Sequence, residues 1–344
     1  MNKIKLLLFS FIVLTVQIKS QTDVKPAYSI FGYVRAWHQT DLAANKGMFS
    51  INMSRIGIKG DLSEYLSYRL FVDFSRLGKL SKETETVEGN EVVTDVSASF
   101  SDYLLDAYAE FKPAKGLSFQ LGQFKNPFST ENLLSAAAIP FINRSLLKSY
   151  SAPGLRDIGL MTTYGGQLPL PFKLNFGLFN GSGQNKTEND KTINYAARLV
   201  ITPIKIFSLS GNYYSGTISN VDTYFWDIGA EYIQSGLFIA AEYGLKNSDL
   251  IVNEKKTNSF FLYGLYDILI ESELFPIIQP GFRIEKADPD DTIADNEISR
   301  YTFGLTFMLT KKKQTHIRLN YEKYDLADGA TNPDKLILEF QIKF

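Results

Sequence analysis

Several residue types that carry enzyme chemistry are scarce or missing in this chain of 344 residues. It has no cysteine, which excludes disulfide bonds, thiol nucleophiles and cysteine-based metal sites. The two histidines, His38 and His316, are far apart in the sequence and belong to no zinc-binding motif. No G-x-S-x-G nucleophile motif, phosphate loop or dinucleotide fingerprint is present. The sequence therefore predicts a protein that is not an enzyme and that needs neither a metal nor a cofactor.

An excess of basic residues is also missing, because the chain has 36 Lys and Arg against 37 Asp and Glu and a net charge of −1. A nucleic-acid-binding domain usually carries a basic surface, so nucleic acid is not expected as a partner. The acidic segment 287–297 offers the oxygen ligands that calcium prefers, but it lacks the glycine and the spacing of an EF-hand. We interpret it as a solvated loop.

After the N-terminal region, no apolar run approaches the about 20 residues that a membrane-spanning helix needs. The mostly apolar run at residues 6–16 is itself too short, and it follows Lys3 and Lys5. A short positive segment, an apolar run and then polar residues are typical of a secretory signal peptide. We predict that residues 1–20 are removed and that residues 21–344 form an exported protein.

Apolar and aromatic residues are nevertheless abundant. Hydrophobic residues make up 44% of the chain, which contains 19 Tyr and 26 Phe, yet the mean hydropathy is close to neutral. A transmembrane β-barrel reconciles these observations, because each strand alternates lipid-facing apolar residues with polar residues that face the interior. Aromatic girdles at the two membrane interfaces account for the surplus of Tyr and Phe.

An alternation of apolar and polar residues, the signature of a strand, recurs along the whole chain. It is clearest at the C-terminus, where the alternate residues from Leu336 to Phe344 are all apolar and most residues between them are polar or charged. A terminal strand that ends in Phe344 resembles the signal that the barrel-assembly machinery of the outer membrane reads. Sixteen such segments occur, an even number as in single-chain bacterial barrels. We place them near residues 28–38, 49–60, 66–75, 101–112, 117–124, 156–165, 170–180, 192–202, 206–217, 222–233, 236–246, 257–269, 274–286, 298–310, 314–324 and 334–344.

The connections between these segments mostly alternate in length, as expected for short periplasmic turns and long outer loops. Residues 113–116 and 203–205 are short connections, whereas residues 76–99 and 181–191 are long ones. One exception is the connection 218–221, which should be an outer loop but is short. A soluble β-sandwich would not be expected to show this alternation.

The longest connection, residues 125–155, is the third outer loop. Ser129 or Thr130 can cap a helix formed by ENLLSAAA, and Pro140 ends it. The apolar segment LLSAAAIPF within this loop must be buried, and the inner wall of a barrel can bury it. The sequence therefore predicts an all-β fold, a 16-stranded antiparallel transmembrane β-barrel with an inward-folded third loop.

Four segments carry a resemblance to a known family. RIGIKGDL (55–62) and YRLFVDF (68–74) look like early strands of the phosphate-selective porin O/P family. LGQFKNPFSTE (121–131) and RSLLKSYSAPGLRDIGL (144–160) resemble the two ends of that family's third loop. The resemblance implies a porin of the bacterial outer membrane, in contact with lipid and commonly a homotrimer, that passes small anions such as phosphate. The Ser-Gln junction near residue 20 and the bias toward Phe, Tyr, Asn and Lys are similar to Bacteroidota members of the family.

An anion pore needs Arg or Lys side chains in a narrow aqueous space, where fixed positive charge replaces the hydration of the ion. Arginine suits phosphate because its planar set of donors matches the oxygen atoms. We expect the pore-lining, anion-selective residues to be Arg55, Lys59, Arg69, Lys125, Arg144, Lys148, Arg156, Lys173 and Arg198.

Two alternatives remain at this point. Inward charges nearly balance along the predicted strands, and Asp227, Glu231 and Glu242 lie roughly opposite the basic early strands, which fits a general, non-selective porin. Each inward charge can also be paired with a charge on a neighbouring strand, in which case it only supports the wall of the barrel. A less favoured alternative is a secreted β protein that binds glycans.

Overall fold

The computed structural model describes residues 27–76, 81–87, 90–97, 103–167, 169–186, 192–218, 221–249, 254–311, 314–327 and 333–344. The predicted signal peptide, residues 1–20, lies outside the described residues. In the part of the chain that is described, no helix is both long and apolar enough to cross a membrane.

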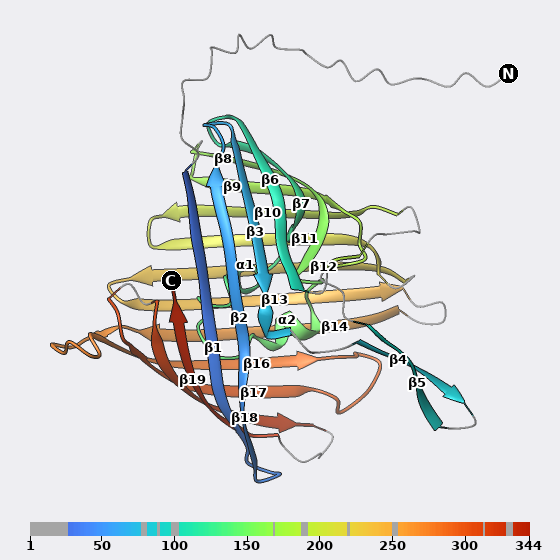
Figure 1. Ribbon diagram of the computed structural model, residues 1–344, viewed down its shortest axis with the longest axis vertical. Helices are drawn as coiled ribbons and strands as arrows, with labels where there is room; N and C mark the ends of the chain where they lie inside the picture. Colours follow the sequence, from blue (N-terminus) through green and yellow to red (C-terminus); the bar gives the residue numbers. More distant parts are fainter. Residues whose placement is uncertain are drawn as a thin grey trace.

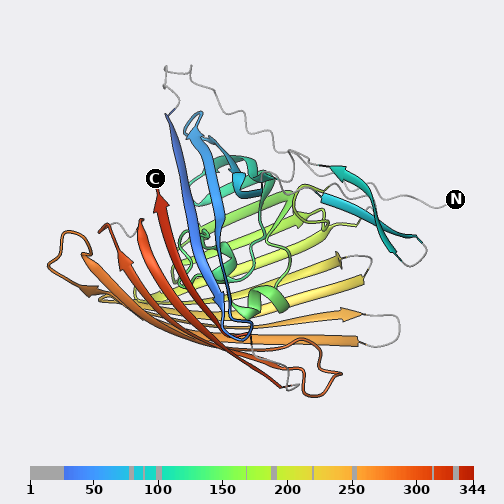
Figure 2. The same ribbon diagram turned by 60° about the horizontal axis from the view of Figure 1, so that its bottom comes forward.

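Sixteen antiparallel strands of the described residues form a closed barrel (Figures 1 and 2). Each strand pairs with its neighbours along the barrel, and β1 pairs with both β2 and β19, so the sheet closes on itself. The strands are β1 (Ala27–Asp41), β2 (Lys46–Asp61), β3 (Leu66–Asp73), β6 (Leu104–Ala114), β7 (Leu117–Lys125), β8 (Arg156–Gly166), β9 (Phe172–Phe179), β10 (Asn194–Ile204), β11 (Phe207–Ile218), β12 (Val221–Gln234), β13 (Leu237–Asp249), β14 (Glu254–Tyr266), β16 (Ile277–Asp288), β17 (Ile298–Met308), β18 (His316–Leu326) and β19 (Lys335–Lys343).

Besides the helices of the third outer loop, four short elements of the described residues lie between barrel strands. The two-residue strand β15 (Ile268–Leu269) follows β14 and pairs with β16. The connection between β3 and β6 begins with a turn of 3₁₀-helix, η1 (Phe74–Arg76), and contains a hairpin of β4 (Ser81–Val87) and β5 (Asn90–Ser97). Figure 1 shows this hairpin projecting away from the barrel. The sequence predicted this connection only as a long loop, because its strands carry few apolar residues to show the alternation.

The predicted alternation on the last strand is confirmed. Leu336, Leu338, Phe340 and Ile342 are exposed on the outer face of β19, whereas Glu339 between them is completely buried. Backbone hydrogen bonds of 3.0 Å in both directions between Gly32 and Phe344 extend the pairing of β19 with β1.

The first hairpin is longer than predicted, since β1 and β2 continue past the apolar segments until Asp41 pairs with Lys46. The residues at this end of the hairpin are mostly polar. Their backbones still pair as strands, but the sequence there lacks the apolar alternation that marks a strand. The short connection after β11 is confirmed, because Ile218 pairs directly with Val221.

The third outer loop, residues 126–155, is called loop 3 below. It contains two short helices, α1 (Thr130–Leu133) and α2 (Leu146–Tyr150), which Figure 2 shows within the ring of strands. The predicted helix ENLLSAAA is wrong in length, because the chain is already extended at Leu134. The carbonyl groups of Asn132 and Leu134 accept hydrogen bonds from Lys125 of β7 and therefore do not continue a helix. Lys125 itself is the last residue of β7 rather than part of the loop.

Aromatic and aliphatic side chains of loop 3 are buried against the strands. Phe128 packs with Phe124 and Phe225, and Leu147 packs with Ala240 and Phe261. The apolar segment that the sequence singled out is also largely buried, with Ala136, Ala137, Ile139 and Phe141 each 5% exposed or less. Burial of these residues against the wall stabilises the position of the loop.

Candidate functional site

Charged side chains on the inner faces of the strands bind the backbone of loop 3. Glu339 of β19 pairs with two arginines, at 2.7 Å from Nε of Arg35 and 2.6 Å from Nη2 of Arg318. Arg35 donates to the carbonyls of Ala136 and Ile142 at 3.1 and 3.0 Å. Arg318 donates to the carbonyls of Ile139 and Pro140 at 2.8 and 3.1 Å, so one ionic cluster holds the middle of the loop.

Two further groups hold the helices of loop 3. Glu285 of β16 accepts hydrogen bonds from the backbone N–H of Leu146, at 2.9 Å, and from Nε of Arg300, at 2.6 Å. On β13, both carboxylate oxygens of Glu242 lie 3.2–3.3 Å from the backbone nitrogen of Thr130 at the start of α1. Nη2 of Arg198 donates to the Thr130 hydroxyl at 3.0 Å. Arg198, which the sequence assigned to the pore, therefore binds the loop.

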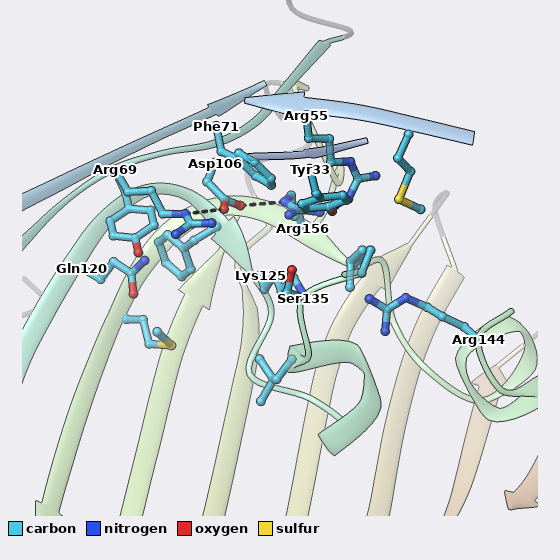
Figure 3. Close-up of a pocket in the computed structure, with 17 residues that line it drawn as sticks. Tyr33, Arg55, Arg69, Phe71, Asp106, Gln120, Lys125, Ser135, Arg144 and Arg156 are labelled. Atoms are coloured by element: carbon cyan, nitrogen blue, oxygen red, sulfur yellow. Dashed lines mark hydrogen bonds and ion pairs between the residues drawn. The ribbon is translucent and has the colours of Figure 1, made fainter. Parts of the chain in front are cut away.

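Basic side chains gather in a cavity between loop 3 and the early strands, here called the basic cavity (Figure 3). Its volume is about 370 Å³. Its basic and acidic lining residues are four arginines, one lysine and one aspartate, and they come from β2, β3, β6, β7, β8 and loop 3: Arg55, Arg69, Asp106, Lys125, Arg156 and Arg144. The cavity thus joins charged residues as far apart in the sequence as Arg55 and Arg156.

Asp106 lies between two of these arginines. Its Oδ2 is 2.8 Å from Nε of Arg69, and its Oδ1 is 2.7 Å from Nε of Arg156 (Figure 3). Both arginines bind this acid through Nε alone, and among the described residues no hydrogen bond engages their terminal Nη atoms. These terminal donors are available to a ligand in the cavity.

The other cations of the basic cavity are fixed more tightly. Arg55 donates from Nε to Asp73 and from Nη1 to the hydroxyl of Tyr33, each at 2.7 Å. Nη2 of Arg144 donates to the carbonyl of Leu134 at 3.0 Å, and its Nη1 donates to the carbonyl of Glu131. Because these two bonds are to neutral carbonyl groups, Arg144 keeps its full positive charge in the cavity.

Five of the nine residues that the sequence proposed for the pore line the basic cavity, namely Arg55, Arg69, Lys125, Arg144 and Arg156. The other four do not. Lys59 lies with its Nζ 5.8 Å from the ring of Phe31, and Lys173 is exposed near the start of β9. Lys148 is in α2, where burial and the nearby Arg144 lower the pKa of its ammonium group.

Two inward arginines were missed by the sequence analysis. Arg35 and Arg300 are both nearly inaccessible, and each donates to the backbone of loop 3. The alternation of the strands does predict their orientation, because the adjacent residues Val34 and Tyr301 face outward. Applying the period of two to every residue of the first and fourteenth predicted strands would have found them.

The acidic cluster that the sequence placed opposite the basic strands is largely enclosed. Asp227 and Glu242 are 1% and 3% exposed, and Asp227 accepts a hydrogen bond from the amide of Asn212. Their carboxylates bind protein groups and are not part of the basic cavity. In the described ranges, no group of three or more His, Asp or Glu is placed to hold a metal ion.

The acidic loop after β16 has partners of its own. Asp290 lies 2.7 Å from Nζ of Lys255, and this hydrogen bond lowers the pKa of Asp290 to about 2. Asp291 accepts a hydrogen bond from the backbone N–H of Lys256. These contacts account for two of the carboxylates considered as calcium ligands.

The overall architecture is that of known porins. The trimer form of OmpT, an outer membrane protein of Vibrio cholerae, superposes with a TM-score of 0.62 at 12% identity, over 93% of this chain and 99% of that one. An anion-selective porin from Comamonas acidovorans gives 0.63 at 14% identity, over 93% and 100%. Salmonella typhi OmpF in complex with daunomycin gives 0.60 at 12% identity, over 92% and 97%. At these identities the similarity establishes the fold.

The sequence itself gives the family. No curated protein matches the chain significantly. The family model described as phosphate-selective porin O and P matches residues 34–220, which is more than half of the chain and includes most of the basic cavity and all of loop 3. The chain is a member of the phosphate-selective porin O and P family, whose members are non-enzymatic β-barrel channels of the outer membrane.

Proposed function

We propose that this porin mediates the passive diffusion of small anions, phosphate among them, and that the basic cavity determines the preference for anions. The observation that carries the proposal is the charge of the cavity, with four arginines against Asp106 as its acidic lining residue. In a confined space of low dielectric constant, such an excess attracts anions and repels cations. Lys59, Lys148, Lys173 and Arg198 contribute positive charge from positions outside the cavity.

The position of loop 3 supports the same proposal. Its contacts with Glu242, Glu285 and Arg318 of the later strands and with Arg35 of β1 hold it in place, and the basic cavity lies between the loop and strands β2 to β8. We propose that loop 3 constricts the aqueous path there, so that a solute passes close to Arg69 and Arg156. A wide path would screen these charges over about 8 Å at physiological salt.

Swelling of proteoliposomes tests the proposal. In isosmotic potassium chloride with the potassium carrier valinomycin, the rate of swelling reports the influx of chloride. We expect rapid swelling with the native protein and a rate at least about twofold lower with Arg69→Gln, because one charge of the cavity is lost. Asp106 keeps its contact with Arg156 in this variant, so the wall stays paired.

Lys286→Gln is the matched control, because Lys286 is exposed and lies at the outer end of β16, where it pairs with Glu297. This control should swell at the native rate. Equal rates for all three proteins would instead support the general, non-selective porin, and the absence of swelling by the native protein would contradict a channel altogether.

We also propose that the porin assembles as a homotrimer in outer-membrane lipid, as the trimer form of the Vibrio protein suggests. Large apolar side chains cover the outer face, including Phe49, Ile51 and Leu121, each more than 60% exposed in the single chain. Lipid and neighbouring subunits can both bury such a surface. Chemical cross-linking in membranes should yield trimers, whereas a ladder that stops at monomer would contradict this assembly. We also propose that the barrel-assembly machinery recognises Phe344 and that the protein comes from a member of the Bacteroidota.

A further inference from the structure

Aromatic rings line the basic cavity beside its arginines. Tyr33, Phe71, Tyr108 and Phe124 contribute to the lining together with aliphatic and methionine side chains. Tyr108 and Phe124 contact each other edge to face, with their ring centroids 6.0 Å apart. A site built only for a fully hydrated inorganic ion would gain nothing from these apolar walls, because such an ion cannot bind favourably to them.

Arg69, one of the two arginines with available donors, lies over two aromatic rings, of which Phe71 belongs to the cavity lining and Phe31 does not. Cζ of Arg69 lies 4.3 Å from the centroid of Phe31 and 5.0 Å from that of Phe71. Cation–π contact of this kind holds a guanidinium group in a fixed plane. Because Nε binds Asp106, the two Nη groups remain for an incoming anion, next to apolar surface.

The size of the cavity also exceeds the need of a small inorganic anion. Its volume of about 370 Å³ lies within the range of about 300–1,000 Å³ that is common for sites of small organic ligands. Such sites are mostly apolar and contain a few polar groups that fix the orientation of the ligand. The basic cavity has this composition, with arginine donors at one side and aromatic rings around them.

We propose that the preferred solutes of this porin are organic anions with a carboxylate on an aromatic body, and that the basic cavity binds them during passage. The carboxylate accepts hydrogen bonds from the terminal nitrogens of Arg69 and Arg156, and the aromatic body packs against the half-buried ring of Tyr108. This inference rests on the proposed anion function and adds the class of solute.

Competition for chloride current in planar bilayers tests the inference, with benzoate, acetate and inorganic phosphate as probes at equal ionic strength. We expect benzoate to halve the chloride current at a concentration about tenfold lower than acetate or phosphate, because only benzoate offers a ring to the apolar walls. The reversal potential in a potassium chloride gradient, measured on the same channels, reports anion preference independently.

Two variants locate the effect. Tyr108→Leu removes a half-buried ring from the cavity, and Arg69→Lys keeps the charge but removes the planar guanidinium group. In each variant, the benzoate concentration that halves the chloride current should be close to the acetate concentration that does so. The channel should still prefer chloride to potassium. Tyr164→Leu is the control, since Tyr164 is 48% exposed on the outer face of β8 and does not line the cavity.

The outcomes separate the two proposals. Anion preference with equal effects of benzoate and acetate would overturn the inference and leave the proposed function intact. Stronger block by benzoate that persists in both cavity variants would also overturn it, because the binding would then lie elsewhere. If the channel shows no preference for chloride, the proposed function is wrong, and the inference that rests on it is wrong as well.

Discussion

At the scale of single residues, Asp106 controls how much positive charge the basic cavity presents. Its carboxylate pairs with Arg69 and Arg156 at the same time, so it offsets part of their charge and also fixes their positions. A neutral residue of the same shape would keep hydrogen-bond acceptance by one oxygen and remove the charge. In the proposed function, the acid therefore limits anion attraction while it positions the two arginines.

The variant Asp106→Asn should consequently shift the reversal potential in a potassium chloride gradient further toward the chloride potential. The comparison is with Asp61→Asn, which removes an acid at the end of β2 whose side chain is 65% exposed. A shift of equal size in both variants would mean that general surface charge, and not the cavity, sets the selectivity. Retained heat-modifiable mobility on SDS gels checks that each variant is folded.

Lys148 provides a pH dependence. Burial and the neighbouring Arg144 lower the pKa of Lys148, so its ammonium group loses its proton at a lower pH than an ordinary lysine does. As the pH is raised, the anion preference should therefore begin to decrease at a pH below about 10.4, which is the pKa of an ordinary lysine. In Lys148→Arg the charge persists through this range, and the reversal potential should stay constant. Identical pH profiles for the two proteins would contradict a role of Lys148.

Residue roles were only partly accessible from the sequence. The alternation of a strand assigns a side chain to the inner or the outer face, and this suffices to place Arg55 and Arg69 inside. It cannot tell a cation in the cavity from one that binds loop 3, such as Arg198, because that depends on where a distant loop folds back. The enclosure of Asp227 and Glu242 depends on the same contact with the loop.

At the scale of elements, loop 3 is held mainly by side chains of the wall that bind its carbonyl groups. Arg318 alone donates to the carbonyls of Ile139 and Pro140, and Arg35 binds the segments on either side. Removing one donor leaves buried acceptors without partners, at a cost of about 1–3 kcal/mol each. The loop should then leave its position part of the time.

Arg318→Met should therefore increase the single-channel conductance and its noise, because a mobile loop 3 opens the constriction. Glu339 keeps its contact with Arg35 in this variant. The matched variant Lys323→Met alters the same strand on its exposed face and should leave the conductance unchanged. Unaltered conductance and noise in Arg318→Met would show that the loop does not depend on this contact.

The elements of loop 3 also show where sequence patterns stop being sufficient. The cap at Ser129 and the apolar segment were both readable, and both are present. The length of the helix was not readable from the sequence, because hydrogen bonds from Lys125 and Arg144 occupy the carbonyl groups that a longer helix would use. Tertiary contacts of this kind override local helix preference.

At the scale of the whole molecule, the closure of the barrel depends on the seam between β1 and β19. A Cβ atom at Gly32 would lie 2.5 Å from the carbonyl oxygen of Arg55 and 2.7 Å from the ring of Phe344. A side chain there must displace the backbone of β2 or the C-terminal residue that pairs with Gly32. The glycine thus permits the two ends of the sheet to meet.

Gly32→Ala should destabilise the barrel by about 1–3 kcal/mol, the usual cost of overpacking. The measurement is the temperature at which the compact band on an SDS gel converts to the unfolded one. Gly211→Ala is the control, because a Cβ atom at Gly211 of β11 would contact nothing within 4 Å. A lower conversion temperature for both variants, by the same amount, would argue against a special role of the seam.

The barrel as a whole was the most predictable feature. Its strands face lipid on one side and the interior on the other, so the period of two appears in nearly every strand, as in β19. The hairpin of β4 and β5 was missed because its alternation is too weak to mark a strand, since Val87 is the one large apolar residue of β4. The closed barrel follows from the need to pair every strand in a membrane, whereas the proposed selectivity rests on a few side chains that only the folded loop brings together.

We propose that the basic cavity makes this porin prefer anions. The most direct test is the reversal potential of the purified native protein in a planar bilayer with a gradient of potassium chloride. We expect a potential of the sign given by chloride diffusion, because four arginines face one aspartate in the lining of the cavity. A potential near zero, or one of the sign given by potassium, would contradict this proposal.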